Sequence, residues 1–112
     1  MAIQKWSERI WVAQLAQDPE FVEDMEVLQQ AARSDQFVPD MVLDLAGVDH
    51  INSSNLSQML TLRKLVTQHE AKVIVAGPTN SVWAVMLTAG LDKLFHFAPD
   101  TMTALAELQL EG

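Results

Sequence analysis

The chain has 112 residues, 49% of them hydrophobic and 20% charged, which suits one folded domain with a core of its own. Its seven basic and 15 acidic residues give a formal net charge of −8, which disfavours binding to nucleic acid or an anionic membrane and suits a protein partner with a basic docking face. Cysteine is absent, and neither a basic leader before an apolar run nor an 18-residue apolar stretch occurs, so we expect a soluble, cytoplasmic protein without disulfides, thiol catalysis or direct membrane insertion.

The first part of the chain predicts two strands and a helix. Residues 2–16 contain two short strand patterns separated by a turn. Asp18 and Pro19 then predict a helix start, with Asp18 as the N-cap and Pro19 at the first helical position. An apolar stripe at helical spacing predicts the face that packs on the core: Phe21, Met25, Leu28 and Ala32. The acidic residues assigned to the solvated face are Glu23, Asp24 and Glu26.

After residue 37, strand patterns alternate with helix patterns. Strands are predicted at residues 41–45, 72–76 and 94–97, and helices at residues 53–69, at 80–89 and from 101 onward. This alternation implies right-handed βαβ crossovers and parallel strands, to which the first two strands add an antiparallel part. We therefore expect an α/β fold, with a mixed, mainly parallel sheet of 4–5 strands and about four helices packed against it, in a single domain over residues 1–112.

The helix predicted at residues 80–89 has two apolar sides. Its inner stripe is predicted to consist of Val82, Val85, Met86 and Ala89. Trp83 and Leu87 lie one turn apart on a different side. Exposed, this pair would form an interaction patch; covered by a neighbouring element, it would belong to the core. The sequence leaves both alternatives open.

Residues 44–56, which we call the serine turn, predict the end of a buried strand, a short polar loop and the start of a helix. Asn52 is a good N-cap, because its side-chain oxygen accepts a backbone N–H that the first helical turn leaves unpaired. Ser53 and Ser54 then lie in the first turn, with hydroxyls pointing outward near the positive end of the helix dipole, where a phosphate is favoured. Ordinary helix capping explains the same three residues.

The serine turn resembles the STAS domain of the anti-sigma factor antagonists, also called anti-anti-sigma factors. The family has an Asp-Leu-Ser-x-Val-x-Phe-like strand end followed by Asp-Ser-Ser-Gly-Leu. The corresponding stretch here is Asp44-Leu45-Ala46-Gly47-Val48-Asp49-His50-Ile51-Asn52-Ser53-Ser54-Asn55-Leu56. A second segment, Ala89-Gly90-Leu91-Asp92-Lys93-Leu94, matches the family pattern Ser-Gly-Leu-x-Lys/Arg-hydrophobic. The resemblance covers about residues 40–108 and extends to residues 1–39 in layout only.

Three departures from the family pattern accompany this resemblance. Asn52 replaces the family's Asp, so it still caps the helix but carries no charge. Asn55 replaces the family's Gly and puts a side chain where a partner or kinase would meet bare backbone. Residues 16–20 match the family poorly, although in the family this loop and helix start lie close to the partner-binding surface. Asp44 could be a catalytic carboxylate from its position alone, and the resemblance makes it a residue that positions the turn.

The resemblance implies a regulatory protein-interaction module rather than an enzyme, with no cofactor and no metal. Unphosphorylated, it would bind an anti-sigma serine kinase and so release a sigma factor; phosphorylation of Ser53 would end that binding. The residues expected to bind the partner are Asn52, Ser53, Ser54, Asn55, Trp83 and Leu87.

Other functions stay open. The Asn52 and Asn55 departures and the Trp83–Leu87 pair favour a non-phosphorylated STAS subunit of a larger assembly, such as a lipid-transport complex or a stressosome-like scaffold. A domain that binds a small ligand or nucleotide is a third alternative, although no glycine-rich phosphate loop and no Gly-x-Ser-x-Gly motif occurs. The histidines lack metal-ligand spacing, but His50 is close in sequence to two aspartates. A homodimer is also compatible with the sequence.

Overall fold

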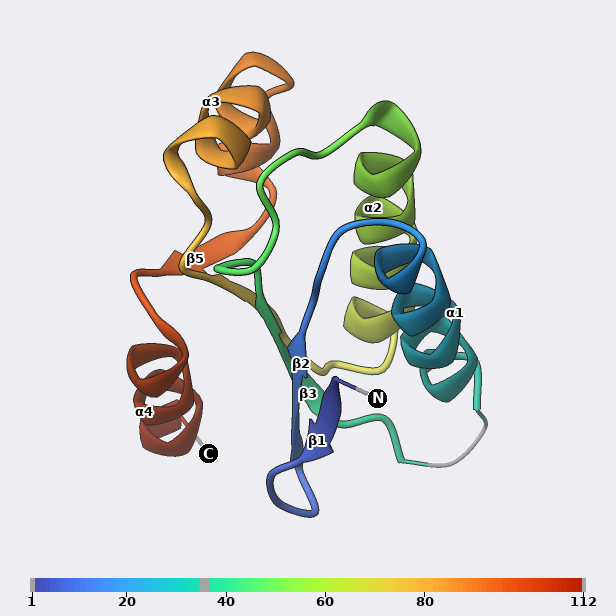
Figure 1. Cartoon of the computed structure of the whole chain (residues 1–112). Helices are drawn as coiled ribbons and strands as arrows, with labels where there is room; N and C mark the ends of the chain where they lie inside the picture. Colours follow the sequence, from blue (N-terminus) through green and yellow to red (C-terminus); the bar gives the residue numbers. More distant parts are fainter. Residues whose placement is uncertain (1, 35–36, 112) are drawn as a thin grey trace.

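A five-stranded sheet forms the centre of the structure, a computed structural model that describes residues 2–34 and 37–111 (Figure 1). The elements in chain order are β1 (Ile3–Lys5), β2 (Ile10–Gln14), α1 (Glu20–Ala32), β3 (Asp40–Asp44), α2 (Ser53–Thr67), β4 (Val73–Ala76), α3 (Asn80–Thr88), a 3₁₀ turn (Leu91–Lys93), β5 (His96–Ala98) and α4 (Thr101–Glu111). The strand order is β1-β2-β3-β4-β5. Only the β1–β2 pair is antiparallel, and β2 to β5 are parallel, which confirms the expected fold class.

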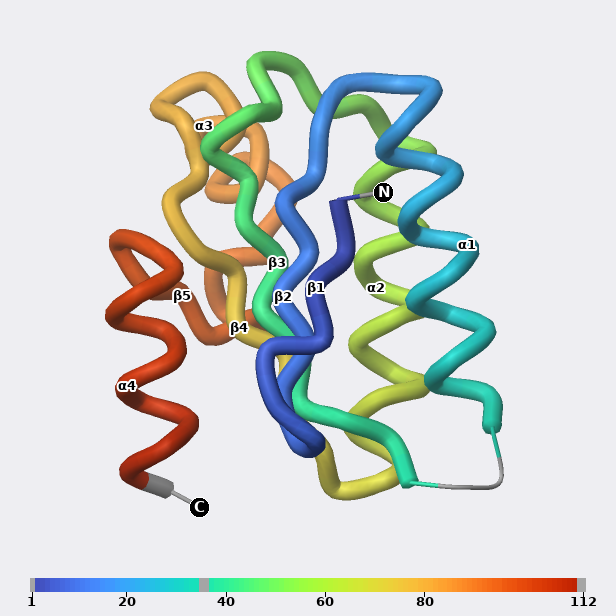
Figure 2. The backbone as a smooth tube through the Cα atoms, turned by 60° about the horizontal axis from the view of Figure 1, so that its bottom comes forward, coloured from blue at the N-terminus to red at the C-terminus, as the bar shows by residue number. Residues whose placement is uncertain are grey.

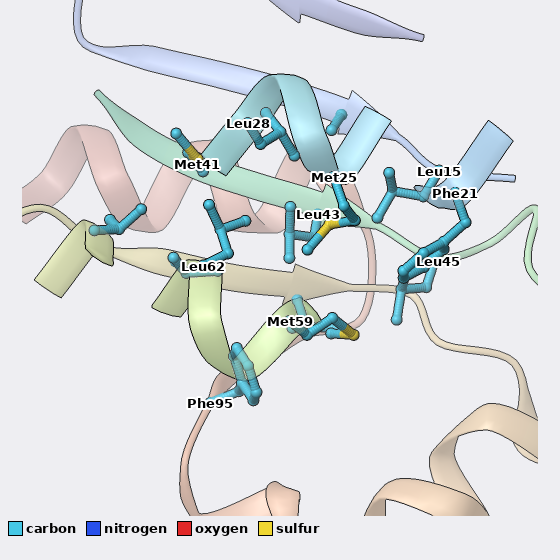
Figure 3. Close-up of a cluster of buried hydrophobic side chains, with 14 of the residues drawn as sticks. Leu15, Phe21, Met25, Leu28, Met41, Leu43, Leu45, Met59, Leu62 and Phe95 are labelled. Atoms are coloured by element: carbon cyan, nitrogen blue, oxygen red, sulfur yellow. The ribbon is translucent and has the colours of Figure 1, made fainter. Parts of the chain in front are cut away.

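The helices cover both faces of the sheet. Helices α1 and α2 lie side by side on one face, and α4 lies on the other (Figures 1 and 2). The larger core fills the space between the sheet and the α1–α2 layer; its principal side chains are Leu15, Phe21, Met25, Leu28, Met41, Leu43, Leu45, Met59, Leu62 and Phe95 (Figure 3). A smaller core beneath α4 contains Ile10, Val12, Val42, Ile74, Ala76, Ala98, Ala104, Leu105 and Leu108.

The two cores explain why β3 is a continuous apolar run. Successive side chains of a strand point to opposite faces, so Met41 and Leu43 enter the larger core while Val42 enters the smaller one. All three are at most 1% exposed. The central strand is therefore buried on both faces, as the sequence predicts.

Helix α1 differs from the prediction in two respects. Pro19, not Asp18, occupies the N-cap position, and no side-chain hydrogen bond caps the helix. The prediction of Asp18 as N-cap is therefore wrong, because the Asp18 carboxylate accepts hydrogen bonds from another element instead. Asp24 is only 7% exposed, so its assignment to a solvated face is also wrong. It lies three residues after Phe21 and four before Leu28, and helical geometry places it beside the buried stripe.

The buried side of helix α3 differs from the predicted inner stripe. Val82 and Met86 are fully buried as predicted, but Val85 is 37% exposed and Ala89 is exposed. The buried arc extends instead toward Trp83, whose ring packs edge-on against Phe97 of β5. Gly90 ends this segment with a positive φ of 76°, as expected for a left-handed helix terminus. In the described residues, no helix combines the length and the apolar character that crossing a membrane requires.

Candidate protein-interaction site

The serine turn lies at the end of the sheet where the parallel strands finish, which we call the carboxyl end. The β2–α1 loop and the β3–α2 loop meet there, and α3 starts nearby (Figures 1 and 2). Loops at this end of parallel strands are common binding surfaces, because the rigid sheet holds them while they stay accessible. The local contacts show how firmly this particular loop is held.

Asn52 caps α2, as the sequence predicts. Its Oδ1 accepts a hydrogen bond of 2.8 Å from the backbone N–H of Asn55. In return, the backbone N–H of Asn52 donates to Oδ1 of Asn55 over 3.1 Å, which completes a capping box. Each asparagine therefore stabilises the helix start through the other.

The amide nitrogens of the same two asparagines bind Asp18. Nδ2 of Asn52 donates to Oδ2 of Asp18, and Nδ2 of Asn55 donates to Oδ1, each over 3.2 Å. Asp18 thus accepts one bond on each carboxylate oxygen and joins the β2–α1 loop to the start of α2. Asn55 is only 3% exposed, so its side chain holds the turn from beneath and is not on the surface where the sequence suggested partner contact.

Gln17 provides a second link between the same two loops. Its Oε1 accepts hydrogen bonds from the backbone N–H groups of Asp49 and His50, the latter over 2.7 Å. Its Nε2 donates to the carbonyl of His50 over 2.9 Å. Gln17 and Asp18 belong to the stretch that matches the family poorly, and the sequence pattern assigns neither of them to the site. The poor match at residues 16–20 occurs together with the Asn52 and Asn55 departures. This co-occurrence is the sequence signal that could have indicated a contact between the two loops.

Two further side chains fix the strand end. Oδ1 of Asp44 accepts from the backbone N–H of Ala46, and Oδ2 accepts from the hydroxyl of Thr101, both over 2.9 Å. The hydroxyl of Thr79 donates to the carbonyl of Val48 over 3.2 Å. Asp44 is therefore occupied in holding the loop, the positioning role that the resemblance implies.

Ser53 and Ser54 remain exposed on this framework. No side-chain hydrogen bond of either serine occurs with any other described residue. Their hydroxyls are thus available at the positive end of the α2 dipole. A rigid cap presents two accessible hydroxyls, which is suited to recognition or modification by another protein.

The carboxyl end of the sheet is strongly acidic. Five exposed acids lie in the loops after β2, β3 and β5 and in the first turn of α1: Asp18, Glu20, Glu23, Asp49 and Asp100. In the described ranges, the loops that follow β2 to β5 contain neither Lys nor Arg. The seven basic residues lie on the β1–β2 hairpin, toward the ends of α1 and α2, and in the segments before β4 and β5: Lys5, Arg9, Arg33, Arg63, Lys64, Lys72 and Lys93. The serine turn therefore lies in the acidic part of a polarised charge distribution.

One of these acids is held in its charged form by local hydrogen bonds. The backbone N–H of Thr103 donates to Oδ1 of Asp100 over 2.8 Å. This bond, with one from the Thr103 side chain, lowers the pKa of Asp100 below its ordinary value of 3.8. The carboxylate caps the first turn of α4.

Trp83 and Leu87 are in different environments. The Trp83 ring is half-buried and contacts Phe97 with ring centroids 4.9 Å apart and planes 81° apart. Leu87 is 46% exposed, and Val85 of the same helix and Leu94 after it are 37% and 44% exposed. A neighbouring strand thus covers part of Trp83, while Leu87 stays accessible.

The histidines do not assemble into a metal site. Among the residues that the structure describes, no group of three or more His, Asp and Glu side chains could hold a metal ion. Nε2 of His96 lies 2.8 Å from Oε2 of Glu107 on the surface. His50 takes part in the site through its backbone rather than its ring.

Comparison with known proteins supports the fold assignment. The family model described as STAS domain matches residues 2–104. A crystal structure of a candidate anti-sigma factor antagonist from Thermotoga maritima superposes with a TM-score of 0.72, at 14% sequence identity, over 92% of this chain and 90% of that chain. A search of curated proteins finds no match. At this level of identity, the likeness to the Thermotoga protein concerns the fold.

Proposed function

Since the chain belongs to the STAS domain family, we propose that it is a regulatory protein-interaction module of the anti-sigma factor antagonist type. In this proposal it works in the cytoplasm as part of bacterial-type transcription regulation and is not an enzyme itself. Unphosphorylated, it binds an anti-sigma serine kinase through the carboxyl end of its sheet. Phosphorylation of Ser53 ends the binding.

The observation that carries the proposal is the free, exposed hydroxyl of Ser53 on a rigid helix cap. A kinase bound over this turn would transfer the terminal phosphoryl group of a nucleoside triphosphate to Ser53 Oγ, releasing the nucleoside diphosphate and the hydroxyl proton. The product carries about −1.5 to −2 charges at one point of the interface. Burying that charge without a partner costs several kcal/mol, so the complex dissociates faster.

The surrounding charge supports a basic partner. The five exposed acids at the carboxyl end steer a positively charged surface toward the serine turn and raise the association rate. Direct contacts would come from Asn52, Ser53 and Ser54, with Leu87 extending the surface along α3. Asn55 would act from beneath by holding the turn.

The test compares four baits in lysate of the source organism: wild type, Ser53→Ala, Ser53→Asp and Ser57→Asp. Ser57 is exposed on α2 one turn after Ser53, so Ser57→Asp controls for an added charge on the same helix. We expect a serine kinase to be retained by wild type, Ser53→Ala and Ser57→Asp, and lost with Ser53→Asp. With the purified kinase and Mg-ATP, wild type should gain the mass of one phosphoryl group and Ser53→Ala should not. Equal retention of the partner by Ser53→Asp and Ser53→Ala would refute the switch.

A second candidate is a constitutive STAS subunit of a larger assembly, such as a transport complex or a scaffold. The exposed apolar side chain of Leu87 on α3 favours it, because exposed apolar side chains suit a permanent contact. In that case a structural component of the assembly would be retained by all four baits, and Leu87→Ser would weaken its retention.

A further inference from the structure

The two asparagines of the serine turn use both ends of their amides. Each Oδ1 accepts the backbone N–H of the other residue, and each Nδ2 donates to Asp18. A carboxylate at position 52 would offer no donor to Asp18, and a glycine at position 55 would remove the other donor. Asn52, Asn55 and Asp18 therefore form one interdependent set, which we call the amide bridge.

The amide bridge spans distant parts of the chain. Asp18 lies 34 residues from Asn52 and 37 from Asn55, and it directly precedes Pro19, the N-cap residue of α1. Asp18 itself is exposed, whereas Asn55 is 3% exposed. If Asp18 left, water would reach the Asn55 amide poorly, so the bridge is stable while intact and costly to open. We call the intact bridge the closed arrangement, and the bridge without the Asp18 bonds the open arrangement.

Ser53 directly follows Asn52, which is one of the three members of the amide bridge. Nδ2 of its neighbour Asn52 donates a hydrogen bond of 3.2 Å to Oδ2 of Asp18. A negative group on Ser53 would repel the Asp18 carboxylate and compete with it for the donors at the start of α2, where the helix dipole favours anions. Both effects act against the closed arrangement.

We propose that a negative charge on Ser53 affects the β2–α1 loop through Asp18. A negative group at position 53 displaces the Asp18 carboxylate from the Asn52 and Asn55 amides and loosens the loop before α1. This inference rests on the proposed function for the source of the charge, a phosphoryl group. In the resembled family the acid stands in the turn itself; here position 52 is an amide, and Asp18 of the neighbouring β2–α1 loop supplies the carboxylate that accepts from it.

The coupling is measurable on the isolated protein with a double-mutant cycle. Ser53→Asp and the uncharged, equally sized Ser53→Asn are compared in the wild-type and Asp18→Asn backgrounds by urea unfolding. The amide introduced by Asp18→Asn keeps an oxygen that can accept from one of the two asparagines, so this background should fold. We expect the charge at position 53 to lower the folding equilibrium constant about three- to tenfold more in the wild-type background than in Asp18→Asn. Equal costs in the two backgrounds would overturn the proposal.

Side-chain amide NMR signals give an independent readout. The Nδ2–H₂ resonances of Asn52 and Asn55 should shift in Ser53→Asp toward their positions in Asp18→Asn and stay unchanged in Ser57→Asp. Resonances that Ser53→Asp leaves at their wild-type positions would contradict the displacement. No partner is present in either experiment. Loss of the coupling and failure of the proposed binding switch are therefore separate results.

Discussion

Replacing Asn52 by Asp restores the acid that the resembled family carries and tests the amide bridge directly. Asp and Asn cap helices about equally well, so the bond from the Asn55 N–H should persist. The variant loses the hydrogen bond to the Asp18 carboxylate, in which Nδ2 and Oδ2 are 3.2 Å apart, and puts two carboxylates in its place.

The magnitude follows from three contributions. A hydrogen bond to a charged group is worth about 1.5–3 kcal/mol, with the lower end appropriate at an exposed site. Repulsion between carboxylates at about 4 Å adds about 1 kcal/mol in water-like surroundings. The new charge gains about 0.3–1 kcal/mol from the helix dipole. The free energy of unfolding should therefore fall by roughly 1–3 kcal/mol.

Urea unfolding followed by far-UV circular dichroism measures this change. The matched control is the double variant Asn52→Asp/Asp18→Asn, which exchanges the amide and the carboxylate across the contact. Because the amide introduced at position 18 can donate to the carboxylate introduced at position 52, the double variant should recover most of the lost stability. If the two substitutions are additive, or if Asn52→Asp is as stable as wild type, the bridge does not stabilise the fold and the reasoning is wrong.

Two further predictions concern the same end of the sheet. Asn55→Gly, which restores the family's residue, removes the bonds to the Asn52 N–H and to Asp18 and should cost roughly 2–3 kcal/mol of unfolding free energy in the same urea assay; an unchanged midpoint would contradict it. The Thr103 hydrogen bonds lower the folded-state pKa of Asp100 below 3.8, so their stabilisation is present above that pH and is lost as the pH falls through the lowered pKa. Wild type should therefore lose more stability than Asp100→Asn between about pH 5 and about pH 3, and equal losses would refute this assignment.

The sheet was predictable because its signals are local. Met41, Val42 and Leu43 form an uninterrupted apolar run, and such a run needs two covered faces. The strand bounds deviate most at the last strand, which was expected at residues 94–97 and lies at His96–Ala98. There the chain first forms a 3₁₀ turn after Gly90, and the apolar residues that follow this turn, Leu94 and Phe95, resemble a strand start.

Two of the errors involve contacts between elements that are distant in sequence. Asp18 precedes Pro19 in a typical helix-start pattern, but the amides of Asn52 and Asn55 bind its carboxylate instead. In α3, the position of Phe97 draws Trp83 inward and leaves Val85 exposed. Helical periodicity places residues relative to one another, whereas the tertiary neighbour decides which side is buried.

The candidate site also has a part that the sequence predicts and a part that it does not. The positions of Asn52 and Ser53 follow from capping chemistry within four residues, so the sequence predicts them. The support from Gln17 and Asp18 depends on how two loops meet at the carboxyl end of the sheet, and no local pattern encodes it. What the sequence does contain is a set of simultaneous departures from the family pattern, which the structure unites in one contact.

The acidity of the carboxyl end constrains how a switch at Ser53 could work. Long-range attraction to a basic partner would grow, not fall, if the phosphoryl charge were simply added to the five exposed acids there. Dissociation must therefore arise from short-range effects: the desolvation of the new charge within the interface and the displacement of groups that shape it. The amide bridge is such a group, since it lies beside Ser53 and fixes the loop before α1. In this account, net charge brings the partner to the turn, and local geometry decides whether it stays.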